Sequence, residues 1–425
     1  MNKDNAHVIL INNSYIDISW HMVEEFASLV MDAGYTPILA MSQKVENPNP
    51  ATYLGSGFID KIKEAIALIS SKNPEFLTNL IIATGFDLTG TQRANLKKIL
   101  GIEVIDRTFI ILKIFENNAH TKEAKLQVDI ASLSWSKNHL INKQGAFSQV
   151  TSGGGLHNKG SGEKKIVLDR RHIDNLINQK KKELDKIKLA RKNSRSKRNN
   201  SGLYKIAIVG YTNAGKSALL NSFLKFSNLS KQVESDDNLF VTLETSTREI
   251  SKYGYMKFLM TDTVGFVRNL PTVLVEAFKS TLEEIKEADL LVHVVDFSDE
   301  DYLKHIEITN SILQEIGVKD IPTIYLYNKY DLAKSSSSKL LDENSMYTSL
   351  VNLDDIDQIY QLICSTLSKD WEEKKLLIPY ENDFFQFCSD NYVISSNKNK
   401  NGYQCTVRLN PRTKYKYDYL FDKNS

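Results

Sequence analysis

The sequence has little cysteine and contains no long apolar run. Its three cysteines among 425 residues lie far apart and form no C-x-x-C pair. This excludes a disulfide framework and a cysteine-based zinc site, and it is typical of a reducing compartment. No segment approaches the roughly 18 apolar residues that span a bilayer. The HVILIN segment that starts at His7 is typical of a strand, not of a secretory signal. We therefore expect a cytoplasmic monomer without a membrane span.

The sequence also has almost no net charge, because Lys and Arg exceed Asp and Glu by only 2. The charges are unevenly placed, however. Between Lys164 and Arg198, fourteen Lys or Arg stand against four Asp or Glu, a local balance of +10 that leaves −8 for the rest. Such a block indicates a polyanion partner, with a solvated helix face as the alternative. The candidate RNA-binding residues are Lys143, His157, Lys159, Lys164, Lys165, Arg170 and Arg171.

A phosphate-binding loop follows the apolar segment Ile206–Val209, which is typical of a buried parallel strand. From Gly210 to Ser217 the sequence has the spacing G-x-x-x-x-G-K-S, and helical periodicity begins at once afterwards. We expect Lys216 to reach the terminal phosphates and Ser217 to bind Mg²⁺. The predicted nucleotide-binding residues here are Gly210, Tyr211, Thr212, Asn213, Ala214, Gly215, Lys216 and Ser217.

Two further motifs select the nucleotide. A D-x-x-G tetrapeptide starts at Asp262, and an N-K-x-D tetrapeptide ends at Asp331, each after its own strand-like segment. The Asp331 carboxylate can accept the N1–H and N2–H₂ donors of guanine, an edge that adenine lacks, so GTP is the predicted nucleotide. The predicted contacts are Asp262, Thr263, Val264, Gly265, Asn328, Lys329, Tyr330 and Asp331, with Thr348, Ser349 and Leu350 in a base loop.

Catalysis is assigned to Lys216, to Thr242 and to the Gly265 N–H, which can bind the γ-phosphate. Thr242 is expected to close over Mg²⁺ from a switch segment, with Thr245 and Thr247 as rivals. The remaining switch contacts are Phe240, Val241, Leu243 and Glu244.

The residue after the D-x-x-G motif predicts slow catalysis. Phe266 stands where Ras-like proteins carry a water-orienting glutamine. We therefore expect slow intrinsic hydrolysis, with a partner group, backbone or ion completing the catalytic site.

In several related GTPases an asparagine at the position of Asn213 helps to hold K⁺, which makes K⁺ a candidate second ion. The alternative is that Asn213 only shapes the loop. Equal turnover in KCl and NaCl would reject the K⁺ hypothesis.

The fold class predicted is a multidomain α/β protein. Alternating strand and helix segments over residues 1–112 indicate a small parallel sheet, followed over 113–200 by a helical hairpin with a glycine-rich tip. Its first helix is expected from Phe109 to Ile141, and Lys192–Gly202 is expected to be a linker. A phosphate-loop domain over 203–369 and a small α+β tail over 370–425 complete the chain. The tail is predicted to contain a strand at Tyr415–Leu420.

Several longer stretches make the sequence resemble the HflX family, the ribosome-associated GTPases of the Obg–HflX group. They are Tyr53–Lys61 (YLGSGFIDK), Thr89–Leu96 (TGTQRANL), Val104–Thr108 (VIDRT), Ala119–Leu133, GYTNAGKS, TDTVGF, RNLPTVLVEAFKSTLEE and NKYD. The resemblance implies GTP hydrolysis coupled to binding of the 50S subunit and its 23S rRNA. It also implies splitting or rescue of stalled ribosomes under stress or antibiotic.

The hairpin tip departs from the family pattern. It reads SGGGLHNKGSGEKK where the family shows a G-x-G-x-R-G-P-G-E-T-Q-like run, so its RNA contacts are an open point and a specialised paralogue is indicated. The other hypothesis from the residues is a regulatory GTPase that binds protein partners, in which the hairpin is a solvated coiled coil. An RNA-remodelling ATPase is disfavoured by Asp331.

Overall fold

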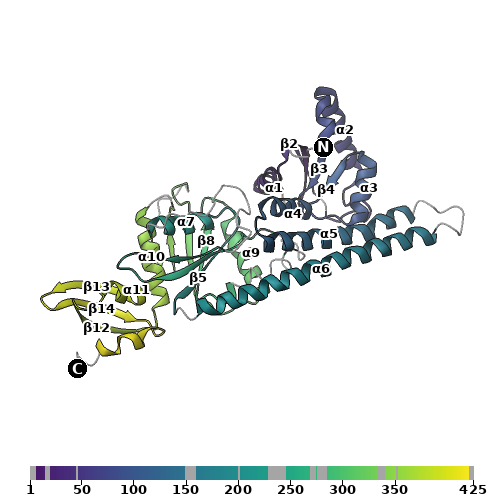
Figure 1. Cartoon of the computed structure of the whole chain (residues 1–425). Helices are drawn as coiled ribbons and strands as arrows, with labels where there is room; N and C mark the ends of the chain where they lie inside the picture. Colours follow the sequence, from purple (N-terminus) through teal and green to yellow (C-terminus); the bar gives the residue numbers. More distant parts are fainter. Residues whose placement is uncertain are drawn as a thin grey trace. The chain divides into compact units, whose positions relative to one another are not determined.

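The computed structural model describes residues 6–14, 20–44, 46–148, 159–199, 202–227, 246–268, 274, 285–332, 340–350 and 353–420. The chain divides into two compact units (Figure 1). One comprises Met1–Lys188 with Leu270–Ala277, and the other comprises Leu189–Asn269 with Phe278–Ser425. Within the described residues, no helix is both long and apolar enough to cross a membrane.

The first unit begins with a four-stranded parallel sheet of order β2-β1-β3-β4. The central strands β1 and β3 carry continuous apolar runs, as strands covered on both faces do, and Val8 to Ile11 are fully buried, whereas no residue of the edge strand β2 is buried. Strands and helices alternate as the sequence predicted. The elements are β1 (His7–Ser14), α1 (Trp20–Asp32), β2 (Thr36–Lys44), α2 (Ser56–Lys72), η1 (Pro74–Asn79), β3 (Leu80–Thr84), α3 (Gly90–Leu100), β4 (Glu103–Ile105) and α4 (Arg107–Asn118).

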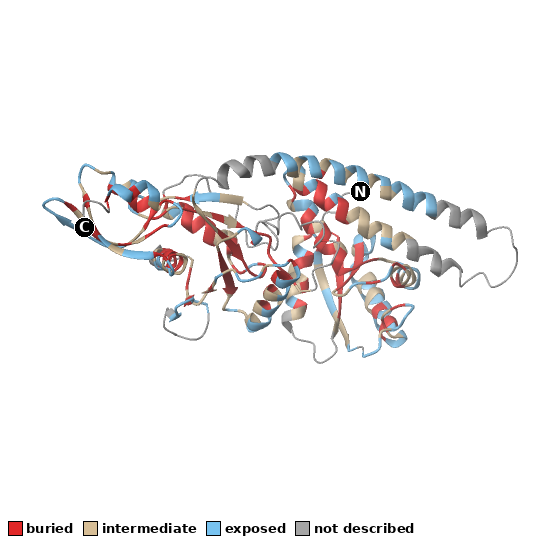
Figure 2. Cartoon of the chain, turned by 90° about the horizontal axis from the view of Figure 1, so that it is seen from below, coloured by how far each residue is buried: buried red, intermediate tan, exposed pale blue. Residues whose placement is uncertain are grey.

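A helical hairpin follows, formed by α5 (Lys122–Ser148) and α6 (Lys159–Asn199). The helices are antiparallel, because Lys180 contacts Asp129 at 2.6 Å while Lys137 pairs with Asp174 farther along. A narrow apolar seam lies between them, and the outer side of the long helix is largely exposed (Figure 2). The buried seam residues are Leu126, Ile130, Ile177 and Leu184.

Two predictions about this region were wrong. The helix expected from Phe109 to Ile141 is interrupted, because Ala119, the residue after α4, is extended and Thr121, the residue before α5, accepts the Ala124 N–H at 3.3 Å. The linker expected at Lys192–Gly202 is helical as far as Asn199. Residues Lys192–Asn199 contain neither glycine nor proline, the two residues that most disfavour a helix, so the helix continues through them.

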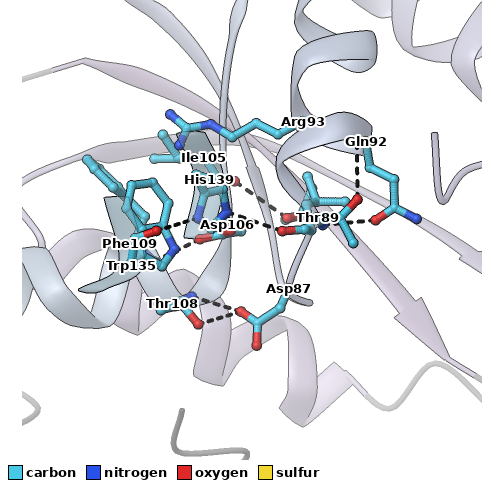
Figure 3. Close-up of polar contacts among 12 residues, drawn as sticks. Asp87, Thr89, Gln92, Arg93, Ile105, Asp106, Thr108, Phe109, Trp135 and His139 are labelled. Carbon is cyan, nitrogen blue, oxygen red and sulfur yellow. Dashed lines mark hydrogen bonds and ion pairs between the residues drawn. The ribbon is translucent and has the colours of Figure 1, made fainter. Parts of the chain in front are cut away.

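His139 of α5 contacts the loop that follows β3 and Asp106, the residue between β4 and α4 (Figure 3). The Nδ1 atom lies 2.9 Å from the Trp135 carbonyl oxygen, and Nε2 lies 3.3 Å from both the Leu88 carbonyl oxygen and Asp106 Oδ2. All three partners are acceptors, so both ring nitrogens need a proton to satisfy them. Burial alone would lower the pKa of His139, but the Asp106 carboxylate and the Trp135 carbonyl together outweigh it and the net shift is upward.

The second unit contains a seven-stranded sheet of order β10-β11-β9-β8-β5-β7-β6. The central strands are parallel, with the antiparallel pairs β6/β7 and β10/β11 at the edges. Helices flank it and pack on a core that includes Phe223, Phe258 and Ile363. The elements are β5 (Tyr204–Val209), α7 (Lys216–Phe226), β6 (Ser246–Ile250), β7 (Phe258–Asp262), β8 (Leu290–Asp296), α9 (Tyr302–Glu315), β9 (Thr323–Asn328), β10 (Leu340–Asp342), β11 (Ser345–Tyr347) and α10 (Leu353–Leu367).

The chain ends in a three-stranded antiparallel sheet of order β12-β14-β13. The strands are β12 (Glu372–Pro379), β13 (Tyr392–Asn399) and β14 (Gly402–Leu409), with helix α11 (Phe384–Asp390) packed on one face. The strand predicted at Tyr415–Leu420 is wrong. That segment lies in the 3₁₀ helix η2 (Lys414–Leu420), in which the buried pair Tyr417 and Leu420 has the three-residue spacing that a 3₁₀ turn aligns.

Candidate nucleotide-binding site

The phosphate loop joins β5 to α7 and depends on backbone shapes that few residues adopt. Gly210 has φ 147°, and a Cβ there would lie 2.2 Å from the Val294 carbonyl oxygen of β8. Gly215 has φ 101° and caps α7. The exposed Asn213 has φ 60°, a left-handed conformation that asparagine tolerates. The loop-shaping reading of Asn213 therefore has a physical basis, whereas its K⁺ role is still a hypothesis.

Lys216 is buried beneath this loop, where its ammonium donates to the Tyr211 carbonyl oxygen at 2.6 Å. Burial lowers its pKa to about 8, and the nearby Asp262 carboxylate limits the shift. Lys216 is thus still largely protonated at neutral pH. His293 of β8 is also buried, and burial together with the Lys216 charge lowers its pKa to about 3. His293 is therefore neutral, as a core residue should be.

The D-x-x-G motif begins where β7 ends beside β5. Ser217 donates to Asp262 Oδ2 at 2.7 Å, and Thr263 Oγ1 donates to the Ile208 carbonyl oxygen at 2.6 Å. A hydroxyl and a carboxylate thus converge at the helix N-terminus, an all-oxygen donor set of the kind that Mg²⁺ prefers. The residues present therefore fit a magnesium ion.

Gly265 lies directly over the phosphate-loop lysine. A Cβ at this position would be 2.9 Å from Lys216 Nζ and 2.8 Å from Thr212 Cγ2, so no larger residue fits without a shift. The next residue, Phe266, is 1% exposed, and its backbone pairs with that of the phosphate loop. Its side chain is part of the protein interior and has no group that could orient water.

The predicted switch residues can be placed only in part. Phe240 to Thr245, with the favoured Thr242, lie outside the described residues. The rival Thr247 lies in β6, where its hydroxyl is 3.0 Å from Thr261 Oγ1. The metal and catalytic roles given to Thr242 stay predictions.

The N-K-x-D motif follows β9 and lies against the phosphate loop. The Asn328 side chain donates to the Ala214 carbonyl oxygen at 2.9 Å and accepts the Leu350 N–H at 3.3 Å. Lys329, with φ 61°, contacts Asp296 at 2.7 Å, and Asp331 is exposed next to Tyr330. Asn328 thus ties the phosphate loop to the base loop, a structural role that its motif alone did not reveal.

The base loop has a support that sequence reasoning missed. Asp355 at the start of α10 is fully buried and accepts the Ser349 N–H at 2.8 Å, with Thr348 Oγ1 at 3.5 Å. Ser222 of α7 donates to the Leu350 carbonyl oxygen at 3.2 Å. No motif marks Asp355, and its only sequence signal is an acidic residue in the first turn of a helix.

Three protein-family models match consecutive parts of the chain. They are described as "GTP-binding GTPase N-terminal" (residues 21–116), "GTP-binding GTPase Middle Region" (118–198) and "50S ribosome-binding GTPase" (205–329). GTPase HflX of Caldanaerobacter subterraneus subsp. tengcongensis is 37% identical over 379 residues, which cover 89% of this chain and 84% of that protein. This chain belongs to the HflX family. GTPase HflX of Escherichia coli K12 is 33% identical over 362 residues, covering 84% of this chain and 82% of that protein.

The HflX-family assignment makes the chain a GTP-binding protein that hydrolyses GTP. Among solved structures, a GTP-binding protein from Sulfolobus solfataricus in complex with GDP matches 85% of this chain and 99% of its own, with a TM-score of 0.44 and 23% identity.

Six of the seven candidate RNA-binding residues of this HflX-family chain lie in the two hairpin helices. Arg170 and Arg171 are exposed on α6. Lys159, Lys164 and Lys165 lie in α6 and Lys143 lies in α5, but their side chains are outside the described part of the structure, as is His157. Their contact with RNA stays a prediction.

Proposed function

We propose that this GTPase acts in the cytoplasm, binds the 50S ribosomal subunit in its GTP form and splits or rescues stalled 70S ribosomes under stress or antibiotic. The observation that carries this proposal is the match of residues 205–329 to a family described as a 50S ribosome-binding GTPase. The exposed basic surface of α6 supports it, since rRNA is a polyanion.

Mg²⁺ belongs to this proposal as the resident ion. Ser217 and Asp262 would hold it, and Thr242 is the further candidate ligand. When bound between these residues and the phosphates, the ion would supply positive charge that neutralises the negative charge developing during phosphoryl transfer. Lys216 would add its own positive charge, and Gly265 would donate its N–H to the γ-phosphate. Phe266 offers no water-orienting group, so slow hydrolysis that the ribosome accelerates is expected.

The decisive test is co-sedimentation of the intact chain with 50S subunits in the presence of a non-hydrolysable GTP analogue. We expect the chain in the pellet with the analogue and less of it with GDP. Deletion of residues Gly145–Gly162 at the hairpin tip should weaken pelleting while GDP affinity is retained, which shows that the nucleotide site still folds. Splitting itself should lower the light scattering of 70S ribosomes.

Two outcomes would contradict the proposal. If the chain stays out of the 50S pellet at low salt, ribosome binding is rejected. If it instead captures protein partners in a manner insensitive to RNase, the regulatory GTPase alternative is favoured.

A further inference from the structure

Tyr211 of the phosphate loop contacts three separate parts of the second unit. Its ring stacks on the His305 ring of α9, with centroids 3.9 Å apart and planes inclined by 9°. Its hydroxyl accepts the backbone N–H of Arg268 at 2.9 Å, and its carbonyl oxygen accepts the Lys216 ammonium. The residue is 6% exposed. The stack on His305 holds the ring in one orientation, so the hydroxyl has a fixed place.

The backbone that Tyr211 holds is the segment directly after Gly265. Thr212 N donates to the Phe266 carbonyl oxygen at 2.8 Å, and Phe266 N donates to the Gly210 carbonyl oxygen at 3.2 Å. The Tyr211 hydroxyl continues this pairing by two residues, to the Arg268 N–H. The Arg268 side chain is held as well, by an ion pair at 3.0 Å with Asp301, the N-cap residue of α9.

This pairing matters for hydrolysis because Gly265 is at its beginning. A main-chain N–H stabilises developing charge only if it is already aimed at the place where that charge appears. The position of the Gly265 N–H depends on the backbone on both sides of it: on Asp262 and Thr263 before it, and on residues 266–268 after it. The strand pairing of β7 fixes the first end, and the Tyr211 contacts fix the second.

We propose that Tyr211 is a positioning residue for GTP hydrolysis, whose hydroxyl holds the Arg268 backbone and thereby aims the Gly265 N–H at the γ-phosphate. The inference rests on the GTPase activity of the chain and does not depend on ribosome binding. It also gives α9 a role, because His305 and Asp301 hold the two residues that form this contact.

The test is single-turnover GTP hydrolysis by the intact Tyr211→Phe chain, without ribosomes. The substitution removes one neutral hydrogen bond and retains the ring, so the hydrolysis rate should fall about 3- to 10-fold. GDP lacks the phosphate that Gly265 contacts, so GDP affinity should change less than about twofold. Tyr392→Phe is the matched control. It loses the hydrogen bond to Gln361 at 2.9 Å, outside the nucleotide site, and should hydrolyse GTP at the wild-type rate.

Tyr211→Ala, which also removes the stacked ring, should reduce hydrolysis further. The proposal is overturned if Tyr211→Phe retains the wild-type hydrolysis rate, even where Tyr211→Ala does not. It is equally overturned if GDP affinity falls by the same factor as the hydrolysis rate, because Tyr211 would then only keep the loop folded. If the chain fails to pellet with 50S subunits but Tyr211→Phe lowers the hydrolysis rate more than the GDP affinity, ribosome binding is rejected and this inference is retained.

Discussion

Asp331 provides the sharpest test at the level of single residues. Its exposed carboxylate follows Asn328, whose side chain ties the phosphate loop to the base loop. Asp331→Asn should reduce GTP affinity at least about 100-fold, because two charge-assisted hydrogen bonds to guanine are lost. Affinity for xanthine nucleotides should rise, since an amide can donate to the 2-oxo group. Nucleotide titrations measure both. Asp60→Asn, an exposed change on α2, is the control, and unchanged GTP affinity of Asp331→Asn would reject the base assignment.

Single residues were predictable from the sequence where one motif carries the chemistry. The spacing from Gly210 to Ser217 and the tetrapeptides at Asp262 and Asn328 place those residues around one loop, as the structure shows. Asp355 and the stacking partner His305 were not predictable. Each acts through one contact with a residue distant in sequence, and such contacts leave no local pattern.

Among the elements, the attachment of α5 to the N-terminal sheet is expected to depend on pH. The pKa of His139 is raised in the folded chain, so its stabilising effect is fully present below its unfolded pKa, near 6.5. That effect is lost as pH rises through the higher folded pKa. The charged groups around the ring are Asp106, which favours the cation, and Arg93, which opposes it.

The amide protection of α5 against hydrogen exchange, corrected for intrinsic exchange rates, should therefore fall from pH 6 to pH 8. His139→Gln should remove most of this decline, since glutamine does not titrate. The exposed His120→Gln is the control and should retain it. An undiminished decline in His139→Gln would show that another group is responsible.

Element types were predictable from hydrophobic periodicity, and the errors have physical causes. The pattern from Phe109 to Ile141 is continuous because both α4 and α5 bury apolar faces, and only the three residues from Ala119 to Thr121 separate the helices. Strand β13 was missed because it is an edge strand with an exposed, polar second half. The polarity of Lys192–Gly202 predicts a linker, but a charged helix has the same composition, and α6 continues to Asn199.

For the molecule as a whole, the basic surface of α6 predicts that the proposed ribosome binding depends steeply on salt. Lys181 and Lys182 are exposed on this helix. Changing both to Glu should make the decline of log affinity with log salt shallower by about 1 to 2 in slope. Each lost phosphate contact releases one counterion fewer on binding. Sedimentation with 50S subunits across a salt series measures it. Lys72→Glu with Lys98→Glu makes the same change in net charge on α2 and α3, and an equal effect there would refute a specific role for α6.

Gly215 of the phosphate loop lies against the side chain of Asn328. A Cβ at this position would lie 2.4 Å from the Asn328 side-chain nitrogen and 3.3 Å from Leu350 Cδ1. The glycine therefore leaves room for the side chain that connects the phosphate loop to the base loop. A substitution at position 215 should therefore displace the Asn328 side chain and also strain the left-handed backbone of the phosphate loop, so that one change weakens phosphate binding and base binding together.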